Sequence, residues 1–399
     1  MTDTHLCLPR RLMLAAVLTL VSFPCRAQGW DSASSREVAP GVVHRRLVSN
    51  QGPWRINVLE IDLTRPGLRV QPVRANDSAL SRETVTSMFG RYRGPGRAVA
   101  AINGDFFNVR TGESENNVVI DGRIDKGITV TESPYDSFDN VHHQLGLDSR
   151  NRPRIERFRL DASMKAPGLE PMRLYGINSW TDSGTIALYT RANGDSTPHD
   201  STGRKPTLVP LILEQRKGNS MIYKVAGNAV EGTRLPLAGG GALVGAGDMR
   251  ELLRSIGRRG GAVSVTARIE PCMCDLRTVI GGWPRVVTNG RSVAEYSGIV
   301  EGTFDRFAGR NPRSAAGFSK DSSTLYLLTV DGRRPTDAGM TLSELAELML
   351  KLGVHNGMNF DGGGSTTMVV AGTVVNRPSD AAGERAVGSG LLVITGADR

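Results

Sequence analysis

The 399-residue sequence is poor in cysteine, and this bounds what can hold the fold together. It contains four cysteines, of which Cys7 and Cys25 fall in an N-terminal segment that we expect to be removed. The remaining pair, Cys272 and Cys274, has C-x-C spacing, which suits a small strained disulfide or two thiols; a metal site is the weaker alternative, because it would need further soft ligands that the sequence does not indicate. A disulfide-stapled scaffold is excluded, and stability must come from a hydrophobic core.

Histidine and aromatic residues are also scarce. The chain has six histidines, and Phe, Trp and Tyr together make up 5% of it. His142 and His143 are adjacent and point in different directions in an extended chain, and no H-E-x-x-H spacing occurs. We therefore expect no essential transition metal and no other cofactor, with carboxylate-bound calcium as an open alternative. Because no dense run of lysine and arginine alternates with aromatic residues, nucleic acid is not expected as a partner.

Long apolar runs are absent beyond the N-terminus. A positive stretch at residues 10–11 and an apolar run at 12–23 have the pattern of a signal peptide over residues 1–27. The run is too short to cross a bilayer, and no later segment approaches about 20 apolar residues. We therefore expect an exported chain, periplasmic or secreted, without a transmembrane segment after processing. Lipid attachment at Cys25 is the alternative, which Pro24 directly before it disfavours.

Acidic residues are outnumbered by basic ones, 40 against 49, which gives a formal net charge of +9. A basic exported protein is attracted to anionic polymers of the cell envelope, including glycans that carry phosphate. The solubility of an arginine-rich chain explains the same charge without any partner. The net charge therefore favours an anionic substrate but does not establish one.

The sequence shows no internal repeat and no low-complexity tract, and glycine and proline are scattered as turn residues. The polar residues 28–37 predict a flexible mature N-terminus, and residues 38–396 predict one continuous domain. Runs rich in apolar or β-branched residues, bounded mostly by Gly, Asp or Asn, predict strands. These runs are residues 56–63, 97–102, 117–120, 185–190, 262–268, 325–330, 358–360 and 366–370.

Three helices are expected. The clearest begins at Thr341, whose spacing to Glu344 is that of a capping box, and ends at Gly353 after an apolar stripe. A second is expected over residues 248–257 and a third over 81–92. Strands that outnumber helices in this way predict an α+β fold, with a large mixed β-sheet as its core and a few packed helices.

The most informative segment is M-N-F-D-G-G-G-S-T-T at residues 358–367. An apolar strand brings Asp361 to its end, and three glycines form a tight turn in which backbone N–H groups can converge on an anion. The segment is neither a G-x-G-x-x-G fingerprint nor a P-loop, so nucleotide binding is disfavoured. A glycine turn with an ordinary aspartate is the plain structural alternative.

A second segment, A-I-N-G-D-F-F-N at residues 101–108, has the same layout, because an apolar strand leads to Asn103 and Asp105. Polar side chains at the ends of buried strands are held by the sheet and remain reachable. Arginines stand in N-P-R-S-A-A-G at 311–317 and G-E-R-A-V at 383–387, and a guanidinium group matches phosphate oxygens in a bidentate way. An Asx turn and surface ion pairs are the structural alternatives for these segments.

Taken together, these segments resemble the phosphodiester glycosidase family. The resemblance spans roughly residues 38–394 and consists of short motifs in one order: A-P-G-V, I-N-G-D-F-F, I-G-G-W-P, N-P-R-S-A-A-G, V-D-G-R, N-F-D-G-G-G-S-T-T, N-R-P-S-D and G-E-R-A-V. The sequence departs from the family pattern at Gly104 and Trp283, and residues 148–236 match only loosely. The shared order is more specific than any single motif and outweighs the structural alternatives.

The resemblance implies a hydrolase that breaks the anomeric C–O bond of a sugar-1-phosphodiester or a phosphorylated glycan. Most glycosidases use two carboxylates, but phosphate is a weak base, so arginine and N–H groups should matter more than a proton donor. Asp361 is expected to face the anomeric carbon as base or nucleophile, with Asp105 or Glu384 as the second carboxylate. The expected substrate-binding residues hold the phosphate (Arg313, Arg385), line the glycine turn as hydrogen-bond donors (Gly363, Gly364, Ser365, Thr366) or orient sugar hydroxyls (Asn103).

Two other functions stay open at this point. A non-catalytic envelope protein would use the same glycine turn and arginines to bind or help assemble an anionic exopolysaccharide. A phosphodiesterase would cleave the P–O bond instead of the C–O bond. Turnover separates the first from an enzyme, and the position of oxygen-18 from labelled water separates the second from a glycosidase.

Overall fold

The computed structural model describes residues 30–50, 52–129, 142–179, 184–199, 205–232, 234–271, 276–301 and 309–396. The structure is 48% strand and 12% helix, with large antiparallel sheets, so the expected α+β fold with a large mixed sheet and packed helices is wrong. The difference arises in the middle of the chain, where charged residues alternate with apolar ones and hide long strands. In β10 (Arg159–Lys165), for example, Leu160, Ala162 and Met164 are buried, and the charged or polar side chains between them are partly or fully exposed.

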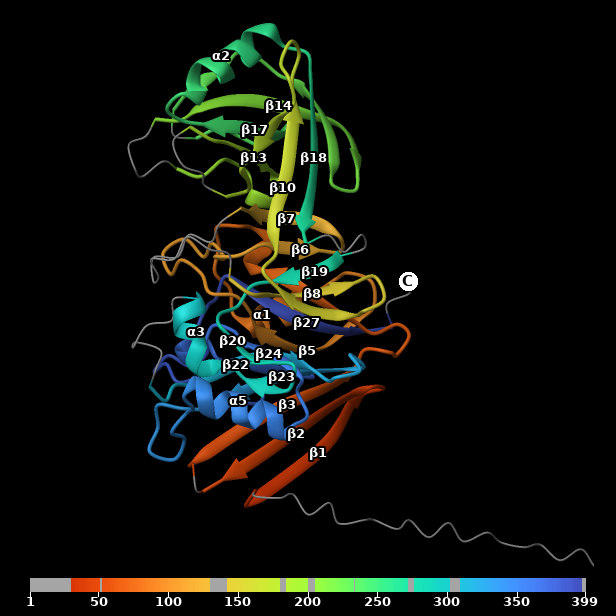
Figure 1. The fold of residues 1–399 in the computed structure, drawn as a ribbon, viewed down its shortest axis with the longest axis vertical. Helices are drawn as coiled ribbons and strands as arrows, with labels where there is room; N and C mark the ends of the chain where they lie inside the picture. The colour runs from red at the N-terminus through yellow and green to blue at the C-terminus, as the bar shows by residue number, and fades with distance from the viewer. Residues whose placement is uncertain are drawn as a thin grey trace, which may run out of the picture.

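Two of the three sheets in the described residues form the lower half of the molecule in Figure 1. One has eight strands in the spatial order β1 (Ser32–Ala39), β2 (Val42–Ser49), β3 (Trp54–Asp62), β23 (Thr324–Val330), β22 (Arg313–Phe318), β24 (Asn356–Asn359), β20 (Arg285–Thr288) and β21 (Arg291–Ser292). The other has five, in the order β26 (Thr373–Val374), β25 (Met368–Val370), β5 (Arg97–Asn103), β27 (Ser389–Thr395) and β4 (Arg69–Arg74).

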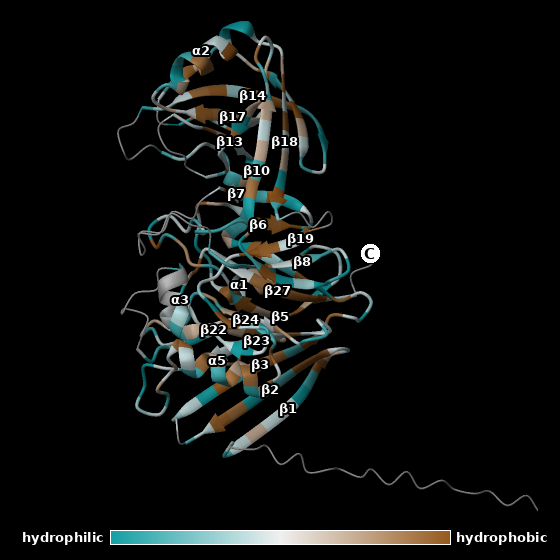
Figure 2. Ribbon diagram, viewed as in Figure 1, coloured by the Kyte–Doolittle hydropathy of each residue, from teal (hydrophilic) through white to brown (hydrophobic). Residues whose placement is uncertain are grey.

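These two sheets pack face to face through one buried apolar cluster. Leu59 and Met358 enter it from the eight-stranded sheet, and Ile102 and Leu391 from the five-stranded sheet. The opposite face of the eight-stranded sheet packs against α5 (Leu342–Lys351), and the opposite face of the five-stranded sheet packs against α1 (Val85–Arg91). The layers are therefore helix, sheet, sheet, helix. Figure 2 shows hydrophobic stretches on inner strands such as β27 and paler or hydrophilic colour on the edge strand β1.

The third sheet carries the middle of the chain; it forms the upper part of Figure 1 and reaches down to the middle of the molecule, where β6 (Val118–Ile120), β19 (Leu276–Ile280) and β8 (Gln144–Asp148) are labelled. Its pairings are antiparallel except between β12 (Gly176–Ile177) and β13 (Ile186–Thr190). A short strand, β16 (Val230–Glu231), joins β14 (Thr207–Lys217) outside the main order. The main order is β11 (Met172–Leu174), β10 (Arg159–Lys165), β18 (Ala262–Glu270), β15 (Ser220–Val225), β14 (Thr207–Lys217), β17 (Gly240–Gly245), β13 (Ile186–Thr190), β12 (Gly176–Ile177), β7 (Arg123–Ile128), β6 (Val118–Ile120), β19 (Leu276–Ile280), β8 (Gln144–Asp148) and β9 (Pro153–Glu156).

The helices of the described residues are few, and the three expected ones are present. Thr341 and Glu344 form the predicted capping box, in which each side chain bonds the backbone N–H of the other. The helix expected from Ser81 begins later, because Thr84 caps it. The helices are α1 (Val85–Arg91), α2 (Met249–Arg259), α3 (Ala294–Glu301) and α5 (Leu342–Lys351), with 3-10 turns η1 (Ala75–Asp77), η2 (Arg191–Asn193) and η3 (Gly363–Ser365).

The end of α2 differs from the expectation. The helix runs through Gly257 and ends at Gly260, whose φ of 65° suits a helix stop. Gly257 has a packing role instead, because a Cβ atom there would lie 2.4 Å from the backbone nitrogen of Ala229. No helix in the described residues is both long and apolar enough to cross a bilayer.

All eight predicted strand segments contain a strand, although many other strands were missed. Residues 32–37, within the segment expected to be flexible, are paired with β2 as part of β1. The predicted signal peptide over residues 1–27 and the pair Cys272 and Cys274 lie outside the described residues.

Candidate active site

Three strand ends meet where the two lower sheets adjoin. β5 ends at Asn103, β24 ends at Asn359 and β22 begins at Arg313. The backbone N–H of Asp361 donates to the carbonyl oxygen of Gly104 at 3.0 Å, which joins the exits of β24 and β5. The sheets thereby bring together the two segments that the sequence singled out.

The strand ends at Asn359 and Arg313 and the segment that follows β5 line a pocket of about 230 Å³. One carboxylate and three guanidinium groups share it, with two phenylalanine rings in its wall. The volume is below the roughly 300–1,000 Å³ of common ligand pockets, so it suits one sugar ring or one phosphate. The described lining residues are Phe106, Phe107, Val109, Asn311, Arg313, Arg333, Asn359, Asp361, Gly362, Gly363, Gly364 and Arg385.

Asp361 supplies the carboxylate of this pocket and is half-buried in it. Removal of the group from water raises its pKa to about 7, and the nearby charge of Asp105 acts in the same direction. Hydrogen bonds from Ser365 and Gly362 and the charge of Arg385 favour the ionised form and limit the rise in pKa. A carboxyl group with a pKa near neutrality gains or loses its proton easily, as a general base requires.

Asp105 lies beside this pocket but is not among its described lining residues. It is 1% exposed, and both of its carboxylate oxygens accept hydrogen bonds from Asn116 at 2.8 Å. Burial raises its pKa to about 6, against the effect of those bonds and of the charges of His142 and Lys126. The structure therefore couples Asp105 to Asp361 through charge and holds it away from the cavity surface.

Arg385 is held in place by a bidentate ion pair with Asp380. Its Nε lies 2.7 Å from Asp380 Oδ2 and its Nη2 lies 3.0 Å from Asp380 Oδ1. Its Nη1 lies 3.5 Å from the hydroxyl oxygen of Ser365, which in turn bonds the carboxylate of Asp361. Asp380, the last residue of N-R-P-S-D, thus aims a guanidinium group at the turn that carries Asp361.

Arg313 is the most buried arginine of the pocket, at 3% exposure. Its Nε donates to the carbonyl oxygen of Met340 at 2.8 Å and its Nη2 to that of Gly309 at 3.0 Å. Burial and the neighbouring charge of Arg333 lower its pKa to about 10. It stays charged at neutral pH, and two adjacent cations in a partly dry site favour a bound anion.

Arg333 was not predicted as a site residue, although its V-D-G-R motif was noted. It follows β23 in a turn with φ of 61°, and its Nη2 donates to the side-chain oxygen of Asn311 at 3.1 Å. Its side chain is exposed at the pocket, and it forms no ion pair with a carboxylate of the described residues. The signal that could have revealed it is its position, directly after a buried strand beside the other strand ends.

The glycine turn makes room for two arginine side chains, whereas three of its backbone N–H groups are already bonded within the protein. The N–H groups of Gly363, Ser365 and Thr366 donate within the protein, to the carbonyls of Pro312, Gly362 and Gly363. A Cβ atom at Gly363 would lie 2.9 Å from Arg333 Nη2. A Cβ atom at Gly364 would lie 2.1 Å from Arg385 Nη2, so only glycines let both guanidinium groups approach.

Asn103, expected to orient sugar hydroxyls, is used inside the protein. It is 1% exposed, and its Nδ2 donates to the carbonyl oxygen of Asp361 at 2.6 Å. Its Oδ1 accepts from the hydroxyl of Ser314 at 2.7 Å and from the N–H of Thr367 at 3.1 Å. Asn103 therefore positions the backbone of Asp361 rather than a ligand.

Asn359 offers a side-chain oxygen to a ligand, whereas that of Asn103 is already bonded within the protein. Its Nδ2 donates to the carbonyl oxygens of Trp283 and Phe360 at 2.6 and 2.7 Å, which fixes the orientation of the amide. Its Oδ1 is buried and has no hydrogen-bond partner among the described residues, and the residue lines the pocket. Such an orphaned acceptor suits a ligand hydroxyl.

Glu384 is not brought into the pocket. Its two carboxylate oxygens accept from the backbone N–H and the hydroxyl of Thr86, at 2.9 and 2.6 Å. Thr86 lies in the first turn of α1, where backbone N–H groups attract a negative charge. Glu384 therefore stabilises a helix end, and its expected role as the second carboxylate has no support in this geometry.

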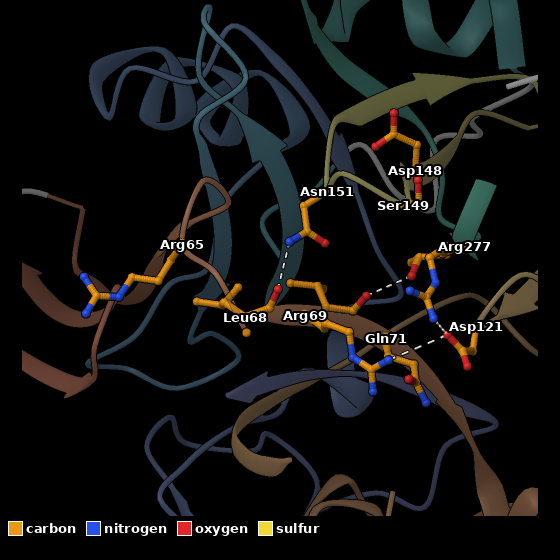
Figure 3. A pocket seen from close by; sticks show the side chains of 12 residues that line it. Arg65, Leu68, Arg69, Gln71, Asp121, Asp148, Ser149, Asn151 and Arg277 are labelled. Atoms are coloured by element: carbon orange, nitrogen blue, oxygen red, sulfur yellow. Dashed lines mark hydrogen bonds and ion pairs between the residues drawn. The ribbon is translucent and has the colours of Figure 1, made fainter. Parts of the chain in front are cut away.

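Two other kinds of site that the described residues could form are a metal centre and a second small cavity. No group of three or more His, Cys, Asp or Glu side chains is arranged there to hold a metal ion. A small cavity of about 30 Å³ lies beside Arg69 and Arg277, which both contact Asp121 (Figure 3). That cavity admits little more than a water molecule, so it is not a substrate site.

Comparison with known proteins agrees with the family suggested by the motifs. Residues 222–394 match the model of the phosphodiester glycosidase family, and this region contains Asp361 and the three pocket arginines. The chain is 44% identical over 80 residues to N-acetylglucosamine-1-phosphodiester alpha-N-acetylglucosaminidase from Bos taurus. That alignment covers 20% of this chain and 15% of the bovine protein. The resemblance to this family is thereby confirmed.

Two solved structures share the fold over most of the chain. A hypothetical protein from Synechocystis superposes with a TM-score of 0.73 at 18% identity, covering 91% of this chain and 64% of that one. A protein from Burkholderia pseudomallei K96243, named as exported, superposes with a TM-score of 0.66 at 22% identity, covering 88% and 77%. At such identities the two structures establish the fold alone.

Proposed function

We propose that this chain is an exported hydrolase that breaks the anomeric C–O bond of a sugar-1-phosphodiester. One observation carries the assignment: a single small pocket contains the carboxyl group of Asp361, with a pKa of about 7, and the guanidinium groups of Arg313, Arg333 and Arg385. Three cations with one acid suit a substrate that has a phosphate beside the bond to be broken. The match of residues 222–394 to the phosphodiester glycosidase family supports the same reaction.

The arginines act on the phosphate. Arg333 forms no ion pair with a carboxylate of the described residues and reaches the pocket from an exposed turn, so it closes on the phosphate as it enters. Arg385 reaches the pocket from the G-E-R-A-V motif, and its ion pair with Asp380 sets the orientation of its guanidinium group. As the C–O bond breaks, negative charge grows on the phosphate, and these fixed cations stabilise it more than they stabilise the substrate.

Asp361 acts on the sugar. As a base it would take a proton from the attacking water, and as a nucleophile it would bond the anomeric carbon directly. Either role needs the ionised form, which Ser365 and Arg385 favour and burial opposes. Asn359 accepts a hydrogen bond from a sugar hydroxyl, and Phe106 and Phe107 offer an apolar surface for the ring.

Asp105 acts through Asp361 and not on the substrate. Its carboxylate is closed off by Asn116, and its charge raises the pKa of Asp361. Asp105 thereby adds to the rise that burial causes in the pKa of Asp361, and a carboxylate with a raised pKa is a stronger base than that of an ordinary aspartate. The reaction should need no transition metal and no organic cofactor. Activity that is lost when the purified protein is treated with a chelator and restored by zinc would contradict this expectation.

The proposal is tested by product analysis with the purified mature chain. A panel of sugar-1-phosphodiesters that differ in the sugar and in the alcohol is incubated in oxygen-18 water. Label in the released sugar means C–O cleavage, whereas label in the phosphate means P–O cleavage and contradicts the proposal. Asp361→Asn should lower kcat by about 10²–10⁴-fold, whereas Asp161→Asn on the exposed side of β10 should not change it. Wild-type turnover by a folded Asp361→Asn protein would remove Asp361 from the reaction.

A further inference from the structure

A second and larger cavity lies between the two halves of the molecule. It has a volume of about 860 Å³ and is lined by β4 and β27 of the five-stranded sheet, by β7 and β14 of the third sheet and by the 3-10 turn η2. None of its described lining residues lines the pocket around Asp361. We refer to it as the inter-sheet cleft. Its volume falls within the roughly 300–1,000 Å³ range of ligand sites.

The inter-sheet cleft is strongly positive. Six of its lining residues are arginines and two are aspartates, Asp77 and Asp125. Both aspartates are already paired, Asp77 with Arg91 and Asp125 with Arg123. Arg191 pairs with Asp195, which does not line the cleft, so the positive charge that remains is carried by Arg74, Arg93 and Arg216.

Arg74 is the central group, because it is buried without a counter-charge in contact. It is 3% exposed, and its Nη1 donates only to the carbonyl oxygens of Ala192 at 3.2 Å and Asp125 at 3.4 Å. No carboxylate of the described residues forms an ion pair with it. Keeping a guanidinium charge away from water is costly unless an anion compensates it. Its burial at the wall of the cleft marks the place where an anion would bind.

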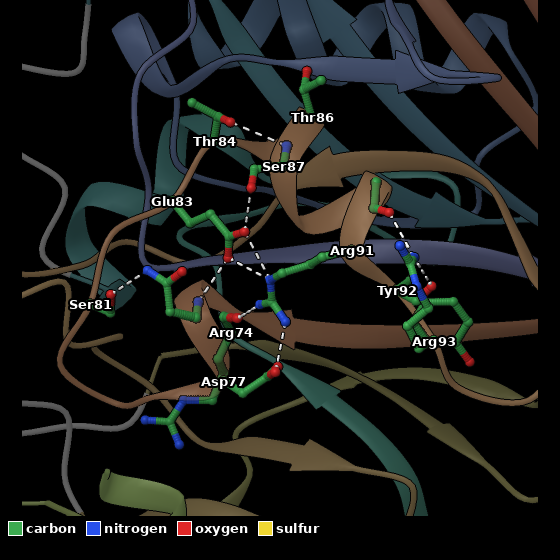
Figure 4. Close-up of polar contacts among 12 residues, drawn as sticks. Arg74, Asp77, Ser81, Glu83, Thr84, Thr86, Ser87, Arg91, Tyr92 and Arg93 are labelled. Atoms are coloured by element: carbon green, nitrogen blue, oxygen red, sulfur yellow. Dashed lines mark hydrogen bonds and ion pairs between the residues drawn. The ribbon is translucent and has the colours of Figure 1, made fainter. Parts of the chain in front are cut away.

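Arg91 and Glu83 fix the frame around Arg74. Arg91 donates to Glu83 through its Nε at 2.8 Å, to Asp77 through Nη1 at 2.7 Å and to the carbonyl oxygen of Arg74 through Nη2 at 2.6 Å. Figure 4 shows this network on one side of the Arg74 backbone, with the Arg74 side chain directed away from it. The acids whose charge acts on Arg74 are each paired with another cation, Asp77 with Arg91, Asp125 with Arg123 and Glu113 with Lys126. None of these three carboxylates contacts the Arg74 guanidinium group, which is left for a ligand.

Arg93 and Arg216 face the cleft from opposite sides. Arg93 follows α1 and donates to the carbonyl oxygens of Gly90 and Tyr92, and Arg216 in β14 contacts the sulfur of Met221. Both side chains are exposed, and neither forms an ion pair with a carboxylate of the described residues. Cations on both walls and at the base suit an extended ligand with several negative charges.

We propose that the inter-sheet cleft binds a glycan chain that carries several phosphate groups, as a holding site separate from the pocket around Asp361. A single phosphate would engage Arg74 alone and leave the two walls unused. Single-stranded nucleic acid is less suited, because its bases need aromatic stacking surfaces and Tyr92 is the one aromatic residue in the described lining. The choice of a phosphorylated glycan rests on the proposed function, whereas the positive cleft does not.

The test measures binding by the full mature chain with Asp361→Asn, so that the ligand is not consumed. The probe is a defined oligosaccharide joined through several phosphodiesters, with a neutral oligosaccharide of equal length, inorganic phosphate and ten-residue oligothymidylate as comparisons. One variant is the double substitution Arg93→Gln and Arg216→Gln. Two further single variants are Arg74→Gln and Arg74→Lys. The control is Arg36→Gln with Arg46→Gln, which removes two exposed arginines of β1 and β2 and the same amount of charge.

The charged oligosaccharide should bind more tightly at low salt, and the Arg93 and Arg216 double variant should raise its Kd at least about tenfold. The control pair should change Kd less than about twofold. Arg74→Gln should abolish binding. Arg74→Lys keeps the positive charge and should retain part of the binding, which separates a loss of charge from a loss of folding. Equal binding by the neutral oligosaccharide, equal binding by oligothymidylate, or equal losses in the control pair would each overturn the proposal.

Hydrolysis separates this proposal from that of the active pocket. On a methyl-phosphate diester of one sugar, too small to reach the cleft, the cleft variants should keep wild-type kcat and KM. If no sugar-1-phosphodiester is cleaved while the cleft variants still lose the charged oligosaccharide, the proposed function fails and the cleft stands. If cleavage occurs and the cleft variants bind as the parent does, the cleft proposal fails alone.

Discussion

The N–H of Asp361 and the carbonyl oxygen of Gly104 are 3.0 Å apart, and this bond joins the exits of β24 and β5. The two strands belong to different sheets, so the bond spans the contact between the layers. It also sets Asp105, the next residue after Gly104, close enough to Asp361 for its charge to raise the pKa of Asp361. This backbone contact thus adds a smaller contribution to the rise in the pKa of Asp361 that burial mainly causes.

Asp361→Asn should stabilise the fold at neutral and alkaline pH. The pKa of Asp361 is raised from its ordinary value to about 7, so the folded chain holds a proton that the unfolded chain releases above about pH 4. The unfolding free energy contributed by this group therefore falls as pH rises from about 4 to 7. The variant should gain up to about 4 kcal/mol at pH 8 and little at pH 4. Denaturant unfolding at both pH values measures the difference, and a gain independent of pH would contradict the raised pKa.

The pH dependence of kcat/KM should report the same group. If Asp361 works as a base or nucleophile, kcat/KM should fall tenfold per unit of pH below about 7. Asp105→Asn should move this limb to lower pH, because the charge of Asp105 raises the pKa of Asp361. Circular dichroism over the same range serves as the control for unfolding. A rate that falls on the alkaline side of pH 7 would instead make Asp361 a proton donor.

Arg333→Ala should weaken phosphodiester binding with little effect on stability. Arg333 is exposed and bonds Asn311 only through Nη2, so its loss removes a cation from the pocket without opening the core. One charge-assisted contact corresponds to roughly a 10- to 100-fold increase in KM. Arg333→Lys should recover part of this loss, and Arg46→Ala on β2 should leave KM unchanged. An unchanged KM in Arg333→Ala would exclude the residue from phosphate binding.

Gly364→Ala should impair the site by moving an ion pair. The new methyl group would lie 2.1 Å from Arg385 Nη2 and Asp380 Oδ1, and both are ends of flexible side chains that can shift. The protein should fold with a loss of at most about 1–2 kcal/mol, while kcat/KM falls at least tenfold. Gly90→Ala is the matched control, because nothing lies within 4 Å of that Cβ position in α1. It should stabilise the helix by up to about 1 kcal/mol and leave the kinetics unchanged.

Glu384→Gln should affect α1 rather than catalysis. The carboxylate of Glu384 accepts from the N–H and hydroxyl of Thr86, and glutamine keeps one acceptor but loses the negative charge at the helix start. A stability loss of about 0.5–1 kcal/mol and a kcat within about threefold of wild type are expected. Thermal unfolding and steady-state kinetics measure the two effects. A fall in kcat comparable to that of Asp361→Asn would return Glu384 to the reaction.

Local sequence predicted the segments of the site better than the roles within it. The apolar run before Asp361 and the capping box at Thr341 were readable because each depends on neighbours within a few residues. Asn103 and Glu384 were assigned to the substrate because their hydrogen-bond partners, Asp361 and Thr86, lie far along the chain. Arg333 was missed for the same reason.

The sequence by itself determined where strands end in polar residues, which turns require glycine and which family the ordered motifs resemble. These are local properties of backbone sterics and of alternating polar and apolar residues. The tertiary structure alone decided that the sheets are largely antiparallel, that Asp361, Arg313, Arg333 and Arg385 share one pocket, and that burial and Asp105 raise the pKa of Asp361. Distance, burial and charge coupling depend on how distant strands pair, and pairing between distant strands is not encoded in any short stretch of residues.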